Sequence, residues 1–339
     1  MIAKLWQSML RTVAALSIAV LLAITWLRDR PAPPNFDQVL KLTQLPLPSE
    51  LRKGPFRLAE VWQLTSPNRN FGGYSALVRP QPGRFLALSD RGLKLEFPEP
   101  GEAAGPIEIG PLLRDQSVQK RNRDVEAAAW DAASGNLWLG LEGRGVVIRL
   151  HPGSLDEVVR TIPEWRDWGE NTGPEAMTRL SDGRFVVLCE CRSSRFDSVN
   201  HPAVLFPGDP THEVAGQMFT FAGADGYRPT DMAQLPDGRV LIVMRRLVWL
   251  VPARFAIKLM LADPAEIAPG RTWAATELTA VDAPWPVDNY EALAIEPLPD
   301  GRIVAWMMSD ENEAVTQRVL LLRLEFRLTD LPPKQKAPG

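Results

Sequence analysis

The sequence predicts an all-β protein: a six-bladed β-propeller preceded by an N-terminal hydrophobic signal or anchor helix. Three observations lead to this prediction. Short β-type runs alternate with turn clusters from about Pro55 onward, one hairpin motif recurs five times, and a basic start precedes an uncharged apolar stretch over residues 12–27. No long amphipathic helix is evident in the body of the chain, which favours a sandwich, barrel or propeller.

The N-terminal segment differs from the rest of the chain. Lys4 and Arg11 precede sixteen uncharged residues at 12–27, and Arg28 ends the run. A basic start followed by an apolar stretch is typical of an export signal. As a helix this stretch would span about 24 Å, short of the roughly 30 Å hydrocarbon core, and no clean cleavage site follows it. We therefore expect residues 1–30 to be a poorly cleaved signal peptide or a single-pass anchor; a buried core helix is the alternative.

A proline-rich stretch at residues 31–54 is predicted to be a linker, which is followed by the propeller at 55–330 and a tail at 331–339. Within the propeller a hairpin unit recurs at residues 72–90, 123–142, 172–190, 228–246 and 289–310. Four of its five turns contain Ser-Gly or Asp-Gly, which are strong hairpin signals. A period near 50 residues built from antiparallel hairpins indicates propeller blades.

The blade number follows from length. Residues 55–330 allow about 46 residues per blade for six blades, within the range of known propeller repeats. Five blades are visible as hairpins, and we expect the sixth to be assembled from residues 319–326 and a closing strand at 57–64. Such closure leaves no exposed sheet edge. Two packed sandwiches are the alternative architecture, but they do not account for one motif repeated along the body.

Composition excludes several classes of function. A net charge of −3 gives no reason to expect a nucleic-acid partner. Three histidines and two cysteines leave few ligands for a zinc or iron–sulfur site, and no nucleophile elbow, H-E-x-x-H or P-loop motif is present. Cys189 and Cys191 would share one strand face about 6.5 Å apart, so two buried apolar side chains are favoured over a redox pair.

Acidic residues mark equivalent positions of the repeat. Glu126, Glu175, Asp231 and Glu291 lead their hairpins, and acids also end the return strands, among them Asp310. Radial repetition would gather these carboxylates around the channel mouth, where they repel one another unless they acquire a cation, protons or arginine partners. Calcium suits such oxygen donors, so these five acids are candidate metal ligands. Backbone capping by the acids and a pure arginine–carboxylate network are the two alternatives.

Several motifs resemble the phytase-like family, also called the "esterase-like activity of phytase" family. They are GGYSAL with FLALSDRG, GPEAM with SDGRFVVLCE, and DNYEALAIEPLPDGR with SDEN, spread over residues 72–326. The resemblance implies an exported bacterial propeller that hydrolyses phosphate or other esters, and similarity to propeller phytases adds calcium at the channel mouth. It also implies roles for six residues beyond Glu126: Asp90, Arg91, Glu175, Glu291, Asp310 and Asn312. The sequence lacks an evident cluster of Lys and Arg for several phosphates, which argues against phytate as substrate.

The predicted function is therefore calcium-assisted hydrolysis of a small anionic or ester substrate, with Asp90, Arg91, Glu175 and Glu291 as catalytic residues. The alternatives are a non-catalytic propeller that binds a ligand or partner at the cell envelope, and a lactonase- or dehydrogenase-like propeller acting on sugars. We expect a monomer in the periplasm or another extracytoplasmic compartment, with membrane attachment through residues 12–27.

Overall fold

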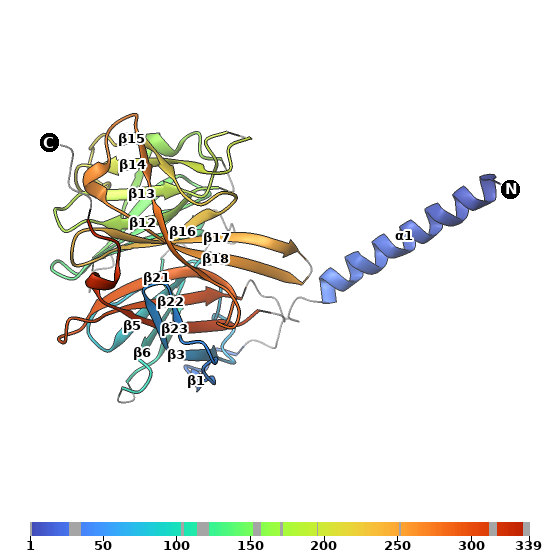
Figure 1. Ribbon diagram of the computed structural model, residues 1–339, viewed down its shortest axis with the longest axis horizontal. Helices are drawn as coiled ribbons and strands as arrows, with labels where there is room; N and C mark the ends of the chain where they lie inside the picture. The colour runs from blue at the N-terminus through green and yellow to red at the C-terminus, as the bar shows by residue number, and fades with distance from the viewer. Residues whose placement is uncertain are drawn as a thin grey trace.

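A computed structural model describes residues 2–26, 35–102, 105–113, 122–151, 157–169, 172–194, 196–250, 252–311 and 317–334. Helix α1 (Ile2–Trp26) precedes the strands and lies outside the β body (Figure 1). Among the described residues, no helix combines the length and apolarity needed to span a membrane. The predicted signal or anchor function of residues 1–30 stays a prediction.

The described strands form five sheets, which we number as blades one to five in chain order (Figure 1). Blade one contains β4 (Tyr74–Val78), β5 (Arg84–Ser89), β6 (Leu93–Pro98) and β7 (Glu108–Pro111). Blade two contains β8 (Val125–Asp131), β9 (Asn136–Leu141), β10 (Val146–Leu150) and β11 (Glu157–Thr161). Blade three contains β12 (Pro174–Arg179), β13 (Phe185–Cys189), β14 (Asn200–Phe206), β15 (Gln217–Ala222) and, parallel at its edge, β19 (Thr272–Ala274).

Blade four contains β16 (Arg228–Gln234), β17 (Val240–Leu250), β18 (Ala253–Ala262) and β20 (Thr276–Val281). Blade five joins the two ends of the body: β21 (Asn289–Pro297), β22 (Ile303–Asp310) and β23 (Val319–Phe326) continue into β3 (Phe56–Thr65), with β1 (Lys41–Gln44) and β2 (Arg52–Lys53) on β3. The first strand of each blade (β4, β8, β12, β16 and β21) lies beside its neighbours in a closed ring.

The propeller prediction is confirmed, but the predicted number of six blades is wrong: the described strands form five. The strands expected to make a sixth blade, at residues 57–64 and 319–326, instead complete the blade begun by the hairpin at 289–310, because β23 pairs with both β22 and β3. Residues 55–330, divided among five blades, give about 55 residues per blade, which agrees with the spacing of the hairpin motifs. The outer strands carry no recognisable motif, so the length that they add to each blade could not be predicted from the repeated hairpins.

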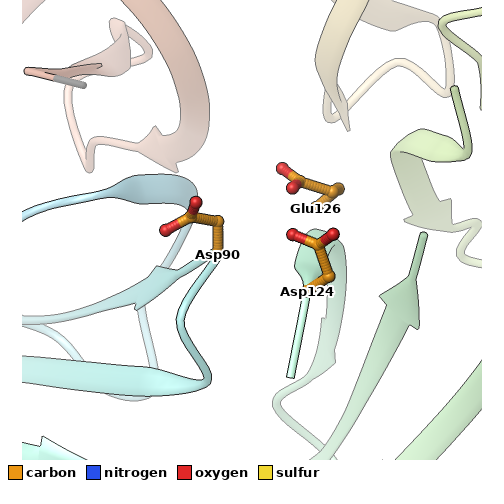
Figure 2. Close-up of side chains that lie close together, drawn as sticks. All are labelled: Asp90, Asp124 and Glu126. Carbon is orange, nitrogen blue, oxygen red and sulfur yellow. The ribbon is translucent and has the colours of Figure 1, made fainter. Parts of the chain in front are cut away.

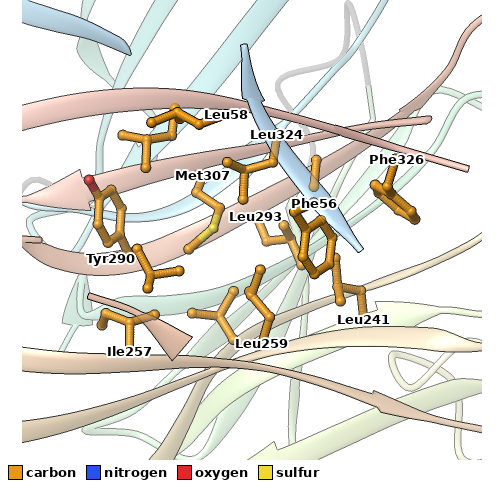
Figure 3. Close-up of a cluster of buried hydrophobic side chains, with 14 of the residues drawn as sticks. Phe56, Leu58, Leu241, Ile257, Leu259, Tyr290, Leu293, Met307, Leu324 and Phe326 are labelled. Carbon is orange, nitrogen blue, oxygen red and sulfur yellow. The ribbon is translucent and has the colours of Figure 1, made fainter. Parts of the chain in front are cut away.

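The core lies between the faces of neighbouring blades. Phe56, Leu241, Leu259, Met307 and Leu324, from blades four and five, are fully buried against one another (Figure 3). Each such side chain contributes about 1.5–3 kcal/mol when it is fully removed from water. Similar clusters fill the spaces between the other blades. The blades are therefore held rigidly around the channel.

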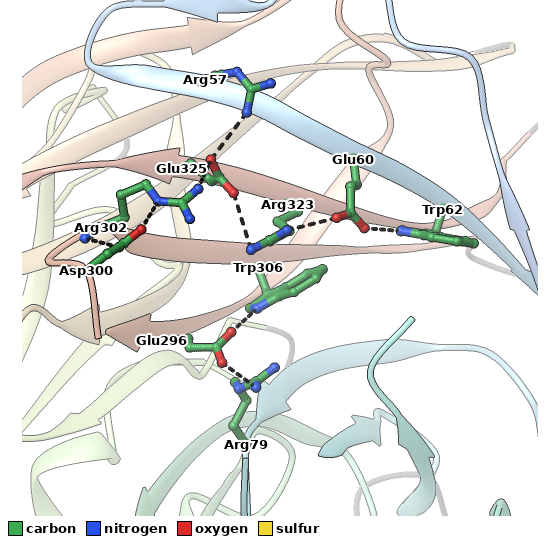
Figure 4. Close-up of polar contacts among 10 residues, drawn as sticks. All are labelled: Arg57, Glu60, Trp62, Arg79, Glu296, Asp300, Arg302, Trp306, Arg323 and Glu325. Atoms are coloured by element: carbon green, nitrogen blue, oxygen red, sulfur yellow. Dashed lines mark hydrogen bonds and ion pairs between the residues drawn. The ribbon is translucent and has the colours of Figure 1, made fainter. Parts of the chain in front are cut away.

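An ion pair connects blade five to blade one. The Arg79 guanidinium donates to Glu296 at 2.8 Å, and the Trp306 indole nitrogen donates to the second oxygen of Glu296 at 2.9 Å (Figure 4). Arg79 also donates to Glu99 of blade one at 2.8 Å. Within blade five, Arg323 bridges Glu60 on β3 and Glu325 on β23. The Arg79–Glu296 contact links the last blade to the first, and the Arg323 contacts join the N-terminal and C-terminal strands within blade five.

The two cysteines form a disulfide, contrary to the expectation of two unlinked apolar side chains. Strand β13 ends at Cys189, so the chain is no longer extended at Cys191 and the two Cα atoms are 5.1 Å apart. The expectation assumed a strand through both residues, with a Cα separation near the limit for a disulfide.

Candidate functional site

A β-bulge starts the first strand of every blade. The pairing register shifts by one residue between Tyr74 and Ala76 in blade one, and at the equivalent point in the four other blades. The residues left out of the pairing are Ser75, Glu126, Glu175, Thr230 and Glu291. Because a bulge re-aims the extra side chain, three of the predicted acids occupy one equivalent position at the channel mouth.

In blade four the equivalent residue is Thr230, which corrects the placement of Asp231 as the lead acid. Asp231 follows the bulge and is buried, where its carboxylate accepts the backbone N–H groups of Met232 at 2.8 Å and Leu293 at 2.6 Å. Burial raises the pKa of Asp231 well above its usual range, although the two N–H donors lower it. This side chain therefore joins blades four and five through backbone hydrogen bonds, as the capping alternative describes.

Arg245 engages two acids of the mouth. Its guanidinium, on β17, pairs with Glu291, donates to the Asn289 side-chain oxygen at 2.8 Å and reaches Glu190 at 3.1 Å. Burial lowers the pKa of Arg245, but Glu291 and Glu190 outweigh it and the net shift is upward. Burial raises the pKa of Glu291, and Arg245 opposes that shift. This part of the ring is therefore an arginine–carboxylate network, the second alternative to a metal site, and it is built on an arginine that the sequence analysis did not name.

Glu175 lies between this network and the acids of blade two. Burial raises its pKa well above the usual range, Glu190 and Glu142 raise it further, and Arg245 lowers it. Glu175 in turn raises the pKa of Glu126. Among the mouth acids, Glu175 is therefore one whose carboxyl retains its proton to higher pH.

Three carboxylates converge between blades one and two. Asp90 follows β5, Asp124 precedes β8, and Glu126 is the bulged residue of β8 (Figure 2). Each offers one oxygen, and these three oxygens all lie within 4.8 Å of one another. Asp124 is buried, whereas Asp90 and Glu126 are half-buried. Burial raises the pKa of Glu126 well above its usual range, followed by the charge of Glu175, a hydrogen bond with Asp124, and the charges of Asp124 and Asp90.

The donor set of this cluster suits a hard cation. Calcium ligands lie at about 2.3–2.6 Å, so two oxygens on opposite sides of one ion are separated by roughly 5 Å. The oxygens of Asp90, Asp124 and Glu126 fall within that separation. The cluster thus unites a predicted catalytic residue, a predicted metal ligand and one acid that the sequence analysis missed.

Two glycines allow close packing beside Asp90. Gly72 and Gly73 have φ angles of +100° and +73°, and the Gly73 N–H donates to Glu311 at 3.2 Å. A Cβ on Gly72 would fall 1.7 Å from a Glu311 oxygen, and one on Gly73 would fall 2.6 Å from Asp90. The Arg91 side chain donates to the Phe71 and Gly72 carbonyls at 2.8 Å each. Arg91 therefore holds this loop in place.

Comparison with known proteins assigns the family. Residues 69–313 match the family model "Phytase-like: Esterase-like activity of phytase". The chain belongs to the phytase-like family. No curated protein matches the chain. The phytase-like match covers all five inner strands and every residue of the three-acid cluster.

Solved structures similar to this phytase-like chain are remote. A PQQ-bound aldose sugar dehydrogenase from Streptomyces coelicolor is 12% identical, with a TM-score of 0.44, and 86% of this chain and 100% of that one are covered. Glutaminyl cyclase from Myxococcus xanthus is 15% identical, with a TM-score of 0.42 and coverage of 80% and 97%. Hydrazine synthase from Kuenenia stuttgartiensis is 12% identical, with a TM-score of 0.38; the match covers 72% of this chain and 58% of that one. The family assignment rests on the family model alone.

The phytase-like motifs led to some site residues and not to others. Asp310 is buried at the end of β22, opposite Asn289, and is not a member of the three-acid cluster. Asn312 lies outside the described residues. Asp124 was missed: it precedes β8, and the bulge at Glu126 interrupts the two-residue alternation that would have placed both side chains on one face. Arg245 was also missed, and its role depends on contacts between residues far apart in sequence.

Proposed function

We propose that this phytase-like propeller is a calcium-assisted hydrolase of phosphate or other esters, with its site at the channel mouth. The observation that supports the proposal is the convergence of Asp90, Asp124 and Glu126 within 4.8 Å. These residues would hold the ion. A bound calcium ion supplies charge stabilisation at a substrate oxygen and activates water, so no serine–histidine pair is needed.

The neighbouring side chains would divide the remaining tasks. Burial and Glu190 raise the pKa of Glu175 well above its usual range, a direction that suits a general acid for the leaving oxygen. Glu291 is occupied by Arg245 and acts as a positioning residue rather than a proton carrier. Arg91 fixes the loop that carries Asp90 through the Phe71 and Gly72 carbonyls. The proposal therefore retains Asp90 and Glu175 at the reacting centre and moves Arg91 and Glu291 to its support.

The test is hydrolysis of p-nitrophenyl phosphate in calcium and in chelator. We expect turnover in calcium only, and loss of turnover in Asp124→Asn and Glu126→Gln. Asp288→Asn is the matched control: it removes a buried carboxylate outside the cluster. Equal turnover in calcium and chelator would contradict the proposal. Glu175→Gln should still bind the ester, but it lacks the carboxyl proton that would protonate the leaving oxygen. We therefore expect kcat to fall by a larger factor than KM rises.

A second candidate is a non-catalytic binding propeller. The engagement of Glu190 and Glu291 by Arg245 favours it, because this network neutralises part of the acidic mouth and leaves fewer groups for proton transfer. Calcium binding without turnover of any tested ester would favour this reading. Under either candidate we propose a small anionic or ester ligand and no nucleic-acid partner. We also propose that residues 1–30 direct the protein to an extracytoplasmic location, which fractionation of the native protein tests.

A further inference from the structure

A cavity lies next to Glu190 and Arg245 of the mouth, against the hairpin of β17 and β18. Its volume is about 510 Å³, in the range of small-molecule sites. Four arginines line it, namely Arg192, Arg228, Arg245 and Arg246, together with one acid, Glu190. The sequence showed no such cluster because these arginines come from three separate segments of blades three and four.

The positive charges of the cavity are only partly neutralised. Glu190 pairs with Arg228 at 3.2 Å and with Arg245 at 3.1 Å. In the part of the chain that the structure describes, no carboxylate pairs with Arg192 or Arg246. The Arg246 guanidinium lies 4.7 Å from the centre of the Tyr227 ring. Two guanidinium groups therefore remain for an anion.

An unsatisfied amide adds a third donor. Gln317 lines the same cavity and is 8% exposed. Its side-chain nitrogen is buried and has no hydrogen-bond acceptor within the described chain. A buried donor without a partner is costly. An anionic oxygen in the cavity would accept its hydrogen bond.

The opposite wall of the cavity is apolar. Strand β16 pairs with β17 only as far as Arg245, so the rest of β17 pairs with β18 alone and the hairpin projects beyond the blade (Figure 1). Leu247 and Leu250 on this hairpin are 49% and 69% exposed, and both line the cavity with Phe255. Exposed apolar side chains beside unpaired arginines make an amphipathic surface.

We propose that this cavity binds phosphate monoesters of hydrophobic alcohols. The phosphate would contact Arg192, Arg246 and Gln317, and the alkyl or aryl group would pack on Leu247, Leu250 and Phe255. Three separate donor groups match the three free oxygens of a phosphate monoester better than the two of a carboxylate. This inference rests on the proposed function because it names a substrate class for the same mouth.

The test is calorimetric binding in chelator, where calcium-dependent turnover is absent. The probes are inorganic phosphate, butyl phosphate, hexyl phosphate and hexanol. We expect affinity to increase by roughly fourfold per buried methylene from butyl to hexyl phosphate. Arg246→Gln and Arg192→Gln should each weaken hexyl phosphate binding by about tenfold, and Leu250→Ser should flatten the chain-length dependence. Arg271→Gln, an exposed arginine outside the cavity, is the matched control.

The outcomes separate this inference from the proposed hydrolase. Hexyl phosphate binding in chelator supports the cavity assignment even if no ester is ever hydrolysed. Binding no tighter than that of inorganic phosphate, or unchanged binding in Arg246→Gln, overturns it while leaving calcium-dependent hydrolysis intact. Binding to phosphatidic acid vesicles but not to hexyl phosphate would assign the arginines to a membrane surface and also overturn it. The three cavity variants, Arg192→Gln, Arg246→Gln and Leu250→Ser, alter exposed side chains, so their thermal unfolding should match that of the wild type.

Discussion

Replacing Glu126 with Gln should stabilise the calcium-free protein, although it removes a polar contact. Two ionised carboxylates whose oxygens lie within 4.8 Å of each other repel by about 3 kcal/mol or more at an effective dielectric constant of 20. Glu126 avoids full repulsion by keeping a proton, which burial and its acidic neighbours favour by raising its pKa. For a carboxyl with an ordinary pKa of 4.5, retaining the proton at pH 7 costs at most about 3.4 kcal/mol.

The sign of the pH dependence follows from the raised pKa. The folded state binds this proton more tightly than the unfolded state, so the stabilisation is complete below pH 4.5 and is lost as pH rises through the folded-state pKa. Glu126→Gln removes the titration. In chelator we expect the variant to melt up to about 6 °C above the wild type at pH 7, taking roughly 2 °C per kcal/mol, and at the same temperature near pH 4.

Calcium should remove most of the difference in melting temperature between the two proteins. At a concentration one hundred times the Kd, a ligand stabilises the folded state by about 2.7 kcal/mol, equivalent to roughly 5 °C here. The variant has lost one charged ligand and should show little of this shift. The assay is differential scanning calorimetry in calcium and in chelator. Asp288→Asn is the control, because it should raise the melting temperature equally in both.

Two results would refute this reasoning. An equal calcium shift in the wild type and in Glu126→Gln would show that the cluster does not hold the ion. A variant less stable than the wild type in chelator at pH 7 would show that Glu126 is ionised and stabilised by donors, and the repulsion argument would fail.

Four further predictions follow from the structure. Burial raises the pKa of Asp288 to about 6, so its contribution to stability is lost as pH rises through 6; Asp288→Asn should add up to about 3 kcal/mol at pH 7 and little at pH 4, measured by urea unfolding. Arg245→Gln leaves Glu291 without its arginine partner and Glu190 with Arg228 alone; it should cost about 3–5 kcal/mol at pH 7, with partial recovery at pH 5, and no loss on urea unfolding would reject the network. Gly72→Ala should destabilise more than Gly101→Ala, since both have positive φ but only Gly72 meets a side chain; similar melting temperatures would contradict the packing argument. Cys191→Ala opens a disulfide with a sequence separation of 2, so calorimetry should show a loss of at most about 1.6 kcal/mol, and thiol titration should find one free thiol where the wild type has none.

The strands that carry the candidate site were predictable because its acidic residues and the hairpin turns belong to one repeated motif. Glu126, Glu175 and Glu291 were found from the residues that begin each hairpin, and all three occupy the bulge. Asp231 was misplaced because a bulge changes which residue faces the channel without changing the sequence pattern, and a one-residue slip reverses the face. The blade count failed because β23 and β3 were assigned to a separate sheet.

Other features depended on contacts that no local pattern encodes. Arg245 meets Glu190 and Glu291 only when blades three, four and five surround the channel. The arginine cavity arises in the same way, because its arginines come from segments that are separate in the sequence. The disulfide depended on where one strand ends, and boundaries are the least determined part of a sequence-based assignment.

The pairing of β3 with β23 also has a consequence in time. Leu64 is paired with Val319, 255 residues later in the chain. At about 5–20 residues per second, a ribosome needs roughly 13–50 s to supply that partner. Until then β3 has an exposed edge and the inner faces of blades one and five are uncovered, so the nascent chain remains open to proteases, chaperones and unwanted strand pairing. Four blades can pair their own strands as they emerge, but the finished ring has to wait for its last strand.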